Sequence, residues 1–241
     1  MTQDDHTPVF NLLRGKGFLI MLGLLSSLAV MSAYGDAKGF EDIPLHNILL
    51  GLSAITGVVA SEAGRKRVRL AMGWAAALVI WDVAAALAEN EAIRRSHSLI
   101  ASGLVIYTLV IVLAHVFKTE RVTSDKIFGA ICGYLLLSFF WAILYSMLCL
   151  FIGEGAFSFS NQPTTAQERS VELNYYSWVT LSTLGYGDVT PTHPLTRVAA
   201  GFEVIVGQFY LAVVVARLVA LQMITGAGSK GFTPTDADPG N

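Results

Sequence analysis

One hexapeptide of the chain has residue types that could coordinate a cation through the main chain. It reads Thr183-Leu184-Gly185-Tyr186-Gly187-Asp188. A cation that leaves water needs replacement oxygens, and side-chain carboxylates would hold a monovalent ion too strongly for rapid release. Backbone carbonyls meet this need if successive carbonyls point to one axis, which requires ordinary and left-handed backbone angles to alternate. Gly185 and Gly187 permit the left-handed angles because they lack a β carbon.

The surroundings of the hexapeptide decide between a pore and an ordinary turn, because a Gly-Tyr-Gly triplet alone is most simply a tight turn. A short apolar and aromatic stretch, Val171 to Thr183, precedes it within the long connection from Gly153 to Pro194. Lipid tolerates such a segment between two membrane spans only as a re-entrant helix and loop, surrounded by protein or by a water-filled cavity. The stretch predicts a helix over Val171 to Ser182, whose negative carbonyl end favours a cation.

The rest of the chain lacks residue patterns for catalysis or metal binding. Cys132 and Cys149 lie in one apolar segment, and on a continuous helix their spacing separates them by roughly 25 Å. That is too far for a disulfide, and neither has a second Cys or a His at ligand spacing, so both are interpreted as packing residues. The sequence contains no phosphate loop, and its polar residues within apolar segments are too few for a membrane enzyme. We expect no enzyme activity and no cofactor.

The composition indicates a membrane protein. Of 241 residues, 16 are basic and 18 acidic, which gives a net charge of -2, a charged fraction of 14% and a hydrophobic fraction of 54%. A soluble domain has about a quarter charged residues, so a water-soluble fold is excluded. A nucleic-acid binder would need a dense cationic face, so we expect no nucleic acid partner.

Six apolar runs are long enough to cross about 30 Å of hydrocarbon as helices. They are Phe18 to Tyr34, Leu45 to Ser61, Leu70 to Ala88, Ser98 to Phe117, Ile127 to Ile152 and Leu195 to Thr225. The second run is short and rich in small residues, which suit close helix contacts in lipid. A cleaved signal peptide is the alternative for the first run, but no small-residue cleavage pattern follows it, which favours a retained anchor.

The basic residues predict a topology with both termini in the cytoplasm, because cytoplasmic loops carry the excess of Lys and Arg. With six spans, 10 basic residues fall in the inner loops and termini and 5 in the outer loops. The predicted division is a cytoplasmic tail (1–17), a four-helix peripheral domain (18–117), a cytoplasmic linker (118–126), a pore domain (127–225) and a disordered cytoplasmic tail (226–241). We expect a multi-pass protein of the cell membrane, with lipid as its solvent.

The hexapeptide and its flanking residues resemble the potassium channels of the pore-loop superfamily. The filter of that family reads Thr-Val-Gly-Tyr-Gly, and this chain differs from it only by Leu184 in place of Val. The resemblance is strongest from Val122 to Leu221 and extends to the first four spans only in hydropathy and placement. It implies an all-α membrane fold with a pore helix and filter loop between the fifth and sixth spans, and a passive pathway for K⁺.

The resemblance also implies roles for individual residues. Carbonyls of Thr183, Leu184, Gly185 and Tyr186 would bind K⁺, and the Thr183 hydroxyl would complete the inner site. The side chains of Leu184 and Tyr186 would point away from the axis into a packed aromatic cuff. Asp188 would lie just outside the filter and hydrogen-bond the aromatic residues of the pore helix. The residues expected to form the cuff are Tyr175, Tyr176 and Trp178.

One filter strand supplies one carbonyl to each layer of the ion cage, whereas the cage needs four strands around its axis. The chain has one such strand. A homotetramer with fourfold cyclic symmetry follows, in which the fifth and sixth spans of each subunit surround the pore.

The last span is expected to line the pore. Gly207 lies 22 residues after Gly185, where the inner helices of the family often place a hinge, although a packing role is equally supported. If Gln208 faces the cavity, a turn of about 100° per residue places a stripe of apolar residues on much the same face as a candidate gate. These are Leu211, Val215, Val219 and Met223.

Two charged residues of the last span are expected to face away from the ions. Glu203 lies about 140° from Gln208 around the helix and should point behind the filter. The hypothesis is that it hydrogen-bonds Thr180, Ser182 or another pore-helix donor and braces the filter; the alternative is a structural acid with no influence on conduction. Arg217 should extend toward the membrane surface or pair with an acid.

Two features of the sequence concern gating. The fourth run contains no Arg or Lys, so little gating charge can move through the field. His97 and His193 could report external pH, although surface histidines seldom do.

The alternatives to a potassium-selective pore are a non-conducting or regulatory channel subunit and a potassium-uptake transporter subunit, which would usually contain internal repeats.

Overall fold

A computed structural model describes residues 8–38, 45–88, 91–118 and 124–228. Seven α-helices form most of the described chain, and a short two-stranded ribbon lies between the fifth and seventh of them. The elements are α1 (Pro8–Lys38), α2 (Leu45–Ala60), α3 (Arg65–Ala88), α4 (Glu91–Lys118), α5 (Ser124–Ile152), a 3-10 turn (Glu154–Ala156), β1 (Phe157–Phe159), α6 (Ala166–Leu181), β2 (Val189–Pro191) and α7 (Pro194–Gly228).

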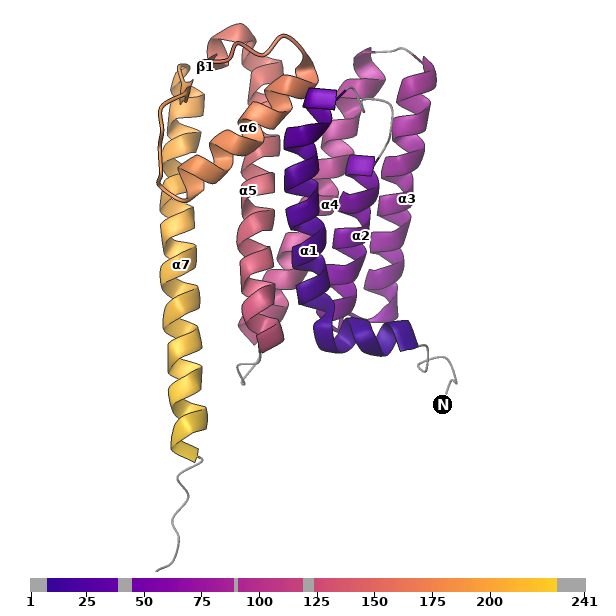
Figure 1. Cartoon of the computed structure of the whole chain (residues 1–241), viewed down its shortest axis with the longest axis vertical. Coiled ribbons are helices and arrows are strands. Elements are labelled where there is room, and N and C mark those ends of the chain that lie inside the picture. The colour runs from indigo at the N-terminus through magenta and orange to yellow at the C-terminus, as the bar shows by residue number, and fades with distance from the viewer. Residues whose placement is uncertain (1–7, 39–44, 89–90, 119–123, 229–241) are drawn as a thin grey trace, which may run out of the picture.

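Helices α1 to α5 stand side by side as a bundle, and α7 runs along one side of it (Figure 1). Helix α6 descends obliquely across α5 toward α7 from the upper end of the molecule in this view. The chain then turns and returns to the same end, where β2 pairs with β1 and α7 begins. The segment from β1 to β2 therefore enters and leaves the molecule at one end, while α7 extends past the bundle at the other.

Among the residues that the structure describes, three helices are long and apolar enough to cross a membrane: Ile100–Lys118, Ser124–Ile152 and Pro194–Arg217. Two shorter apolar helices, Lys16–Met31 and Ile48–Ala60, coincide with the first and second predicted spans. The chain is thus a membrane protein in which three of the six predicted spans have the required length and composition. Membrane crossing by the first three runs stays a prediction.

Helices α1 and α7 extend past the predicted domain boundaries. Helix α1 begins at Pro8, inside the predicted N-terminal tail, and has a non-helical residue at Lys16 (φ -135°). Figure 1 shows that the part before this kink lies across the lower end of the bundle. Helix α7 continues to Gly228, into the predicted disordered tail. The remainder of that tail, and residues 119–123 of the predicted linker, lie outside the described residues.

Small residues bring α1, α2 and α3 close together, as the sequence predicted for the second run. A β carbon on Gly17 would lie 2.6 Å from Cβ of Ala60, and one on Gly51 would lie 2.9 Å from Cβ of Ala75. Lipid supplies no hydrophobic drive between helices, so close van der Waals packing of this kind must hold the bundle. Both cysteines are free and buried, in agreement with a packing role.

We predict that Gly17→Ala destabilises the bundle, because the new methyl group has to displace the backbone of α1 from α2. Overpacking of this kind costs about 1–3 kcal/mol. Gly23→Ala is the matched control, since it lies in the same helix and an added β carbon meets nothing within 4 Å. Thermal unfolding in detergent should show a lower midpoint for Gly17→Ala alone. Equal midpoints for the two variants would contradict the close packing of α1 on α2.

Candidate functional site

Helix α6 leads into the hexapeptide and begins five residues before the predicted start at Val171. The cause is a capping box: the Thr165 hydroxyl accepts from the Glu168 N–H at 3.0 Å, and Glu168 Oε2 accepts from the Thr165 N–H at 3.2 Å. A capping box of this kind gives acceptors to backbone N–H groups that have no partner at the start of a helix. Glu168 Oε2 also accepts from the Thr164 N–H, and these backbone bonds lower the pKa of the Glu168 carboxyl. The helix ends at Leu181.

The backbone of the hexapeptide alternates between left-handed and ordinary conformations. The φ angle is +62° at Thr183, +57° at Gly185 and +81° at Gly187, whereas Leu184 and Tyr186 have negative φ. The two glycines take the left-handed angles that the sequence predicted for them. Thr183 was not predicted to do so, and its β carbon makes this conformation cost on the order of 1 kcal/mol or more.

The N–H groups at the start of the hexapeptide turn back to α6. Thr183 N donates to the Thr180 carbonyl at 2.9 Å, and Leu184 N donates to the Val179 carbonyl at 2.8 Å. Gly185 N also donates to Val179, at 3.3 Å. The carbonyls of residues 183–187 accept no hydrogen bond recorded for the described chain. A row of main-chain oxygens is thereby left available to something outside this chain.

Asp188 anchors the outer end of the hexapeptide. The Tyr175 hydroxyl of α6 donates to Asp188 Oδ2 at 2.7 Å, so the predicted bond to a pore-helix aromatic is present. The backbone carbonyl of Asp188 accepts from both the N–H and the hydroxyl of Ser160, each at 2.9 Å. Ser160 follows β1, which pairs antiparallel with β2 through Phe157 and Pro191. The chain before α6 therefore clamps the chain after the hexapeptide.

The predicted aromatic cuff is not formed within one chain. The side chains of Leu184 and Tyr186 are 54% and 67% exposed. Tyr176 packs instead toward α5 and β1, with ring centroids 5.2 Å from both Tyr145 and Phe157. Trp178 likewise faces α5, edge-on to Phe139. Within one chain, α6 therefore packs these two aromatics against α5 and β1, and a cuff around an assembled filter stays a prediction.

Two contacts fix the inner end of α6. The Tyr134 hydroxyl of α5 donates to the Leu181 carbonyl at 3.0 Å. Gly207 of α7 lies against the same residue, and a β carbon there would come 2.7 Å from the Leu181 carbonyl oxygen. Helix α7 is continuous through Gly207. Of the two interpretations of this glycine, close packing is the one with a contact to support it.

Glu203 lies where α5, α6 and α7 meet, and its side chain is fully buried. The Tyr145 hydroxyl donates to Glu203 Oε2 at 2.5 Å. The Ser177 hydroxyl oxygen lies 2.5 Å from Glu203 Oε1 and 2.8 Å from the Ser138 carbonyl oxygen of α5. The predicted contact to α6 is therefore present, but its partner is Ser177 rather than Thr180 or Ser182. Tyr145 was missed, because no spacing within α5 shows which residue of another helix it faces.

The exposed face of α7 includes the residues predicted to line a cavity. Gln208 is exposed, as are Leu211, Val215 and Val219, at 41%, 55% and 46%. No element of the described chain covers them. The guanidinium of Arg217 lies 5.4 Å from the ring centroid of Phe117 in α4, a cation–π contact that neither of its two predicted roles included.

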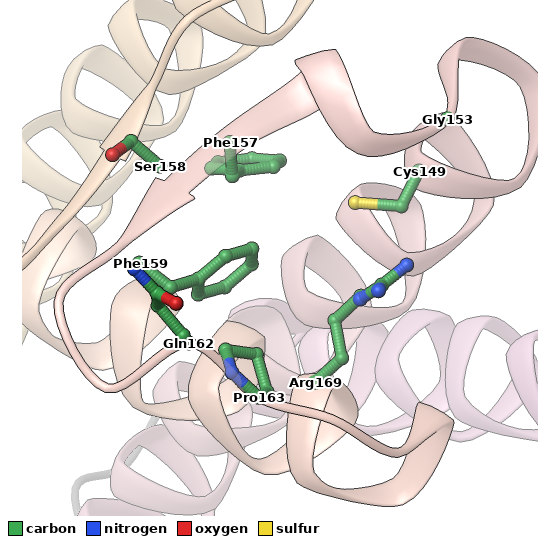
Figure 2. Close-up of a pocket in the computed structure, with 8 residues that line it drawn as sticks. All are labelled: Cys149, Gly153, Phe157, Ser158, Phe159, Gln162, Pro163 and Arg169. Carbon is green, nitrogen blue, oxygen red and sulfur yellow. The ribbon is translucent and has the colours of Figure 1, made fainter.

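A half-open cavity of about 400 Å³ lies beside β1, between the end of α5 and the first turn of α6. Figure 2 shows the Arg169 side chain extending into it toward Cys149, with Phe157 and Phe159 on the other side. None of the residues predicted for the site lines this cavity.

Residues 134–223 match a protein family model described as "Ion channel". The match covers well under half of the chain, but it includes most of α5, all of α6, the hexapeptide and most of α7. The described site and the family domain therefore occupy the same part of the chain. No curated protein matches the chain.

The Tyr175–Asp188 contact predicts a defined pH window of stability. The bond from Tyr175 lowers the pKa of Asp188, and the same bond raises the pKa of Tyr175 to about 12. The ordinary values are about 3.9 for Asp and about 10 for Tyr. The contribution of Asp188 to folding stability is therefore present when the pH is above the ordinary pKa of Asp, and it is lost as the pH falls through the lowered pKa of Asp188. The contribution of Tyr175 to folding stability is complete when the pH is below the ordinary Tyr pKa of about 10. It is lost as the pH rises through the raised pKa of about 12.

We predict that Tyr175→Phe removes the alkaline limb of this dependence and weakens the acid limb, because the Val189 N–H still donates to Asp188 in the variant. Thermal midpoints in detergent, measured across the acid and alkaline ranges, should fall less steeply at both ends in the variant than in the parent chain. Thr190→Val, at an exposed residue of β2, serves as a control with the parent profile. A Tyr175→Phe profile parallel to that of the parent would contradict the assigned bond.

Proposed function

We propose that the ion channel domain of residues 134–223 forms a potassium-selective pore that passes K⁺ passively, without coupled chemistry. The observation that carries the proposal is the backbone of residues 183–187. Its alternating φ angles leave a row of carbonyls without donors, while the first N–H groups bond to α6. Such a row can replace the hydration shell of a monovalent cation and still release it. K⁺ sites are assigned to Thr183, Leu184, Gly185 and Tyr186, with Gly187 completing the filter.

Four chains are needed to make one pore. One row of carbonyls provides one oxygen for each layer, so a cage requires fourfold repetition around an axis. The exposed side chains of Leu184 and Tyr186 support this arrangement, because a neighbouring subunit can cover them. The uncovered face of α7 supports it as well, with Gln208 toward the cavity and Val215 and Val219 toward a hydrophobic inner gate.

The remaining site residues are proposed to hold the filter rather than to touch ions. Asp188 and Tyr175 fix its outer end, and Glu203 braces α6 from behind. Tyr176, Trp178 and Thr180 act through α6, which they tie to its surroundings. The first four helices form a peripheral domain, and α4 contributes little gating charge, since Ile100–Lys118 has its basic residue, Lys118, at its very end. Both termini are placed in the cytoplasm.

The alternatives predict different behaviour of the purified chain. A non-conducting or regulatory subunit would give no flux by itself in liposomes, and a potassium-uptake subunit would need coupling or further filter loops. The described chain has one such hexapeptide, and the ion channel domain suggests a pore rather than an enzyme. Passive K⁺ flux is therefore the function that the site supports best.

We predict that Gly185→Ala abolishes the preference for K⁺ over Na⁺, because alanine at φ +57° strains the filter backbone. Reversal potentials of the reconstituted chain in mixed K⁺ and Na⁺ baths should show the preference reduced at least about tenfold, equivalent to about 1.4 kcal/mol. Gly155→Ala is the control: an added β carbon also meets nothing there, but φ is not positive. Retained selectivity in Gly185→Ala would remove residues 183–187 as the filter.

We predict that the full chain assembles as four copies. Native mass spectrometry from detergent or nanodiscs should give a particle of four 25.9 kDa chains. The reason is that a single row of carbonyls has no function without three others. A conducting particle that is monomeric or dimeric would exclude the proposed ion cage.

A further inference from the structure

The contacts of Glu203 constrain where its proton lies. The carboxyl group, the Tyr145 ring and the Ser177 side chain are all fully buried, so water cannot supply or accept the missing hydrogen bonds. Three short oxygen–oxygen contacts connect these groups and the Ser138 carbonyl, at 2.5, 2.5 and 2.8 Å. Contacts of this length are favourable only when a proton lies between the two oxygens.

The Ser177 hydroxyl cannot serve both of its neighbours as a donor. A serine hydroxyl carries one proton, and it lies between Glu203 Oε1 and the Ser138 carbonyl oxygen. A carboxylate and a carbonyl are both pure acceptors. If Glu203 is ionised, either the 2.5 Å or the 2.8 Å contact contains no proton and becomes a repulsive contact of two oxygens.

The neutral acid removes this conflict. The protonated Oε1 of Glu203 donates to Ser177, Ser177 donates onward to the Ser138 carbonyl, and Tyr145 donates to Oε2, which is then the carbonyl oxygen of the acid. Each of the three contacts contains one proton, and the side chains of Glu203, Ser177 and Tyr145 each have a partner. Buried networks of this kind stabilise a structure only when each member is satisfied.

The charges around Glu203 favour the same form. The ionisable groups in its electrostatic range are the phenols of Tyr134 and Tyr145 on α5 and of Tyr176 on α6. Among the described residues, no basic side chain is recorded against the carboxyl group. Burial of a carboxylate without a cation has a large desolvation cost, and contacts with three phenols do not offset that cost.

We propose that Glu203 is held as the neutral carboxylic acid and donates its proton to Ser177, so that a one-directional hydrogen-bond relay joins α7 through α6 to the Ser138 carbonyl of α5. The relay meets α6 two residues before Val179, whose carbonyl accepts from Leu184 and Gly185. Glu203 is therefore a positioning residue that acts on the candidate filter through α6. This deepens the brace proposed above, but the readouts below need no ion flux, so a chain that conducts nothing can still pass them.

The first test is infrared spectroscopy of the full chain in liposomes at neutral pH. The difference between the parent chain and Glu203→Gln should contain the C=O stretch of a protonated carboxylic acid, which moves on labelling of glutamate carboxyls with ¹³C. In Tyr145→Phe this band should shift to higher frequency, because the acid carbonyl loses its donor. Bands of a carboxylate in place of the acid band would overturn the proposal.

The second test compares two substitutions of Glu203 by thermal unfolding. Glutamine reproduces the neutral acid, since its NH₂ group can donate to Ser177 and its carbonyl can accept from Tyr145. Glu203→Gln should keep the parent midpoint, whereas Glu203→Leu, which leaves the Tyr145 hydroxyl without an acceptor, should lower it by roughly 4 °C or more. A Glu203→Gln chain as unstable as Glu203→Leu would contradict the neutral acid. If Glu203→Leu does not fold, Glu203→Gln is compared with Tyr145→Phe, and a midpoint of Glu203→Gln below that of Tyr145→Phe is the contradicting result.

Discussion

The structure of the site depends on the direction in which one short stretch of backbone presents its polar groups. Main-chain oxygens can be offered to an ion only if the N–H groups of the same residues are satisfied elsewhere and no local donor takes the oxygens. The carbonyl of Val179 meets the first requirement for Leu184 and Gly185, because the end of α6 supplies acceptors that a helix leaves unpaired. The positive φ angles at Thr183, Gly185 and Gly187 meet the second. Helix α6 is therefore the acceptor surface from which the candidate filter extends.

The contacts of the neighbouring helices hold α6 in one position. Its outer end is fixed by the capping box and by the bond from Tyr175 to Asp188, and its inner end by Tyr134 and Gly207. Glu203 acts between these two ends. Polar contacts of this kind lie within the part of the chain that matches the ion channel family model. Helices α1 to α3 instead combine close approach at small residues, as at Gly17, with the burial of large apolar side chains such as Phe18 and Leu78.

The sequence predicted the parts of the site that depend on local backbone chemistry. Gly185 and Gly187 indicated left-handed angles, and the apolar stretch before them indicated a helix. The helix begins earlier than the apolar stretch predicts, because the Thr165–Glu168 capping box, a local pattern present in the sequence, sets its start. The contact of Tyr145 with Glu203 could not have been predicted, since hydrophobic periodicity does not show which residues of two helices contact each other. The apolar parts of α1 and α2, Lys16–Met31 and Ile48–Ala60, are shorter than the later candidate spans, so membrane crossing by these helices stays a prediction.

The contact of Gly207 with Leu181 has a mechanical consequence for any opening of the pore. Helix α7 is continuous past this point, and its backbone touches the last residue of α6 with no space for even a methyl group. The same face of α7 carries Glu203 about one turn earlier, joined to α6 through Ser177. Two contacts one turn apart define the orientation of α7 against α6. A movement of the lower half of α7 must then either bend the helix below Gly207 or displace the end of α6 from which the row of carbonyls begins, so the proposed gate and the candidate filter cannot move independently unless the bend is local.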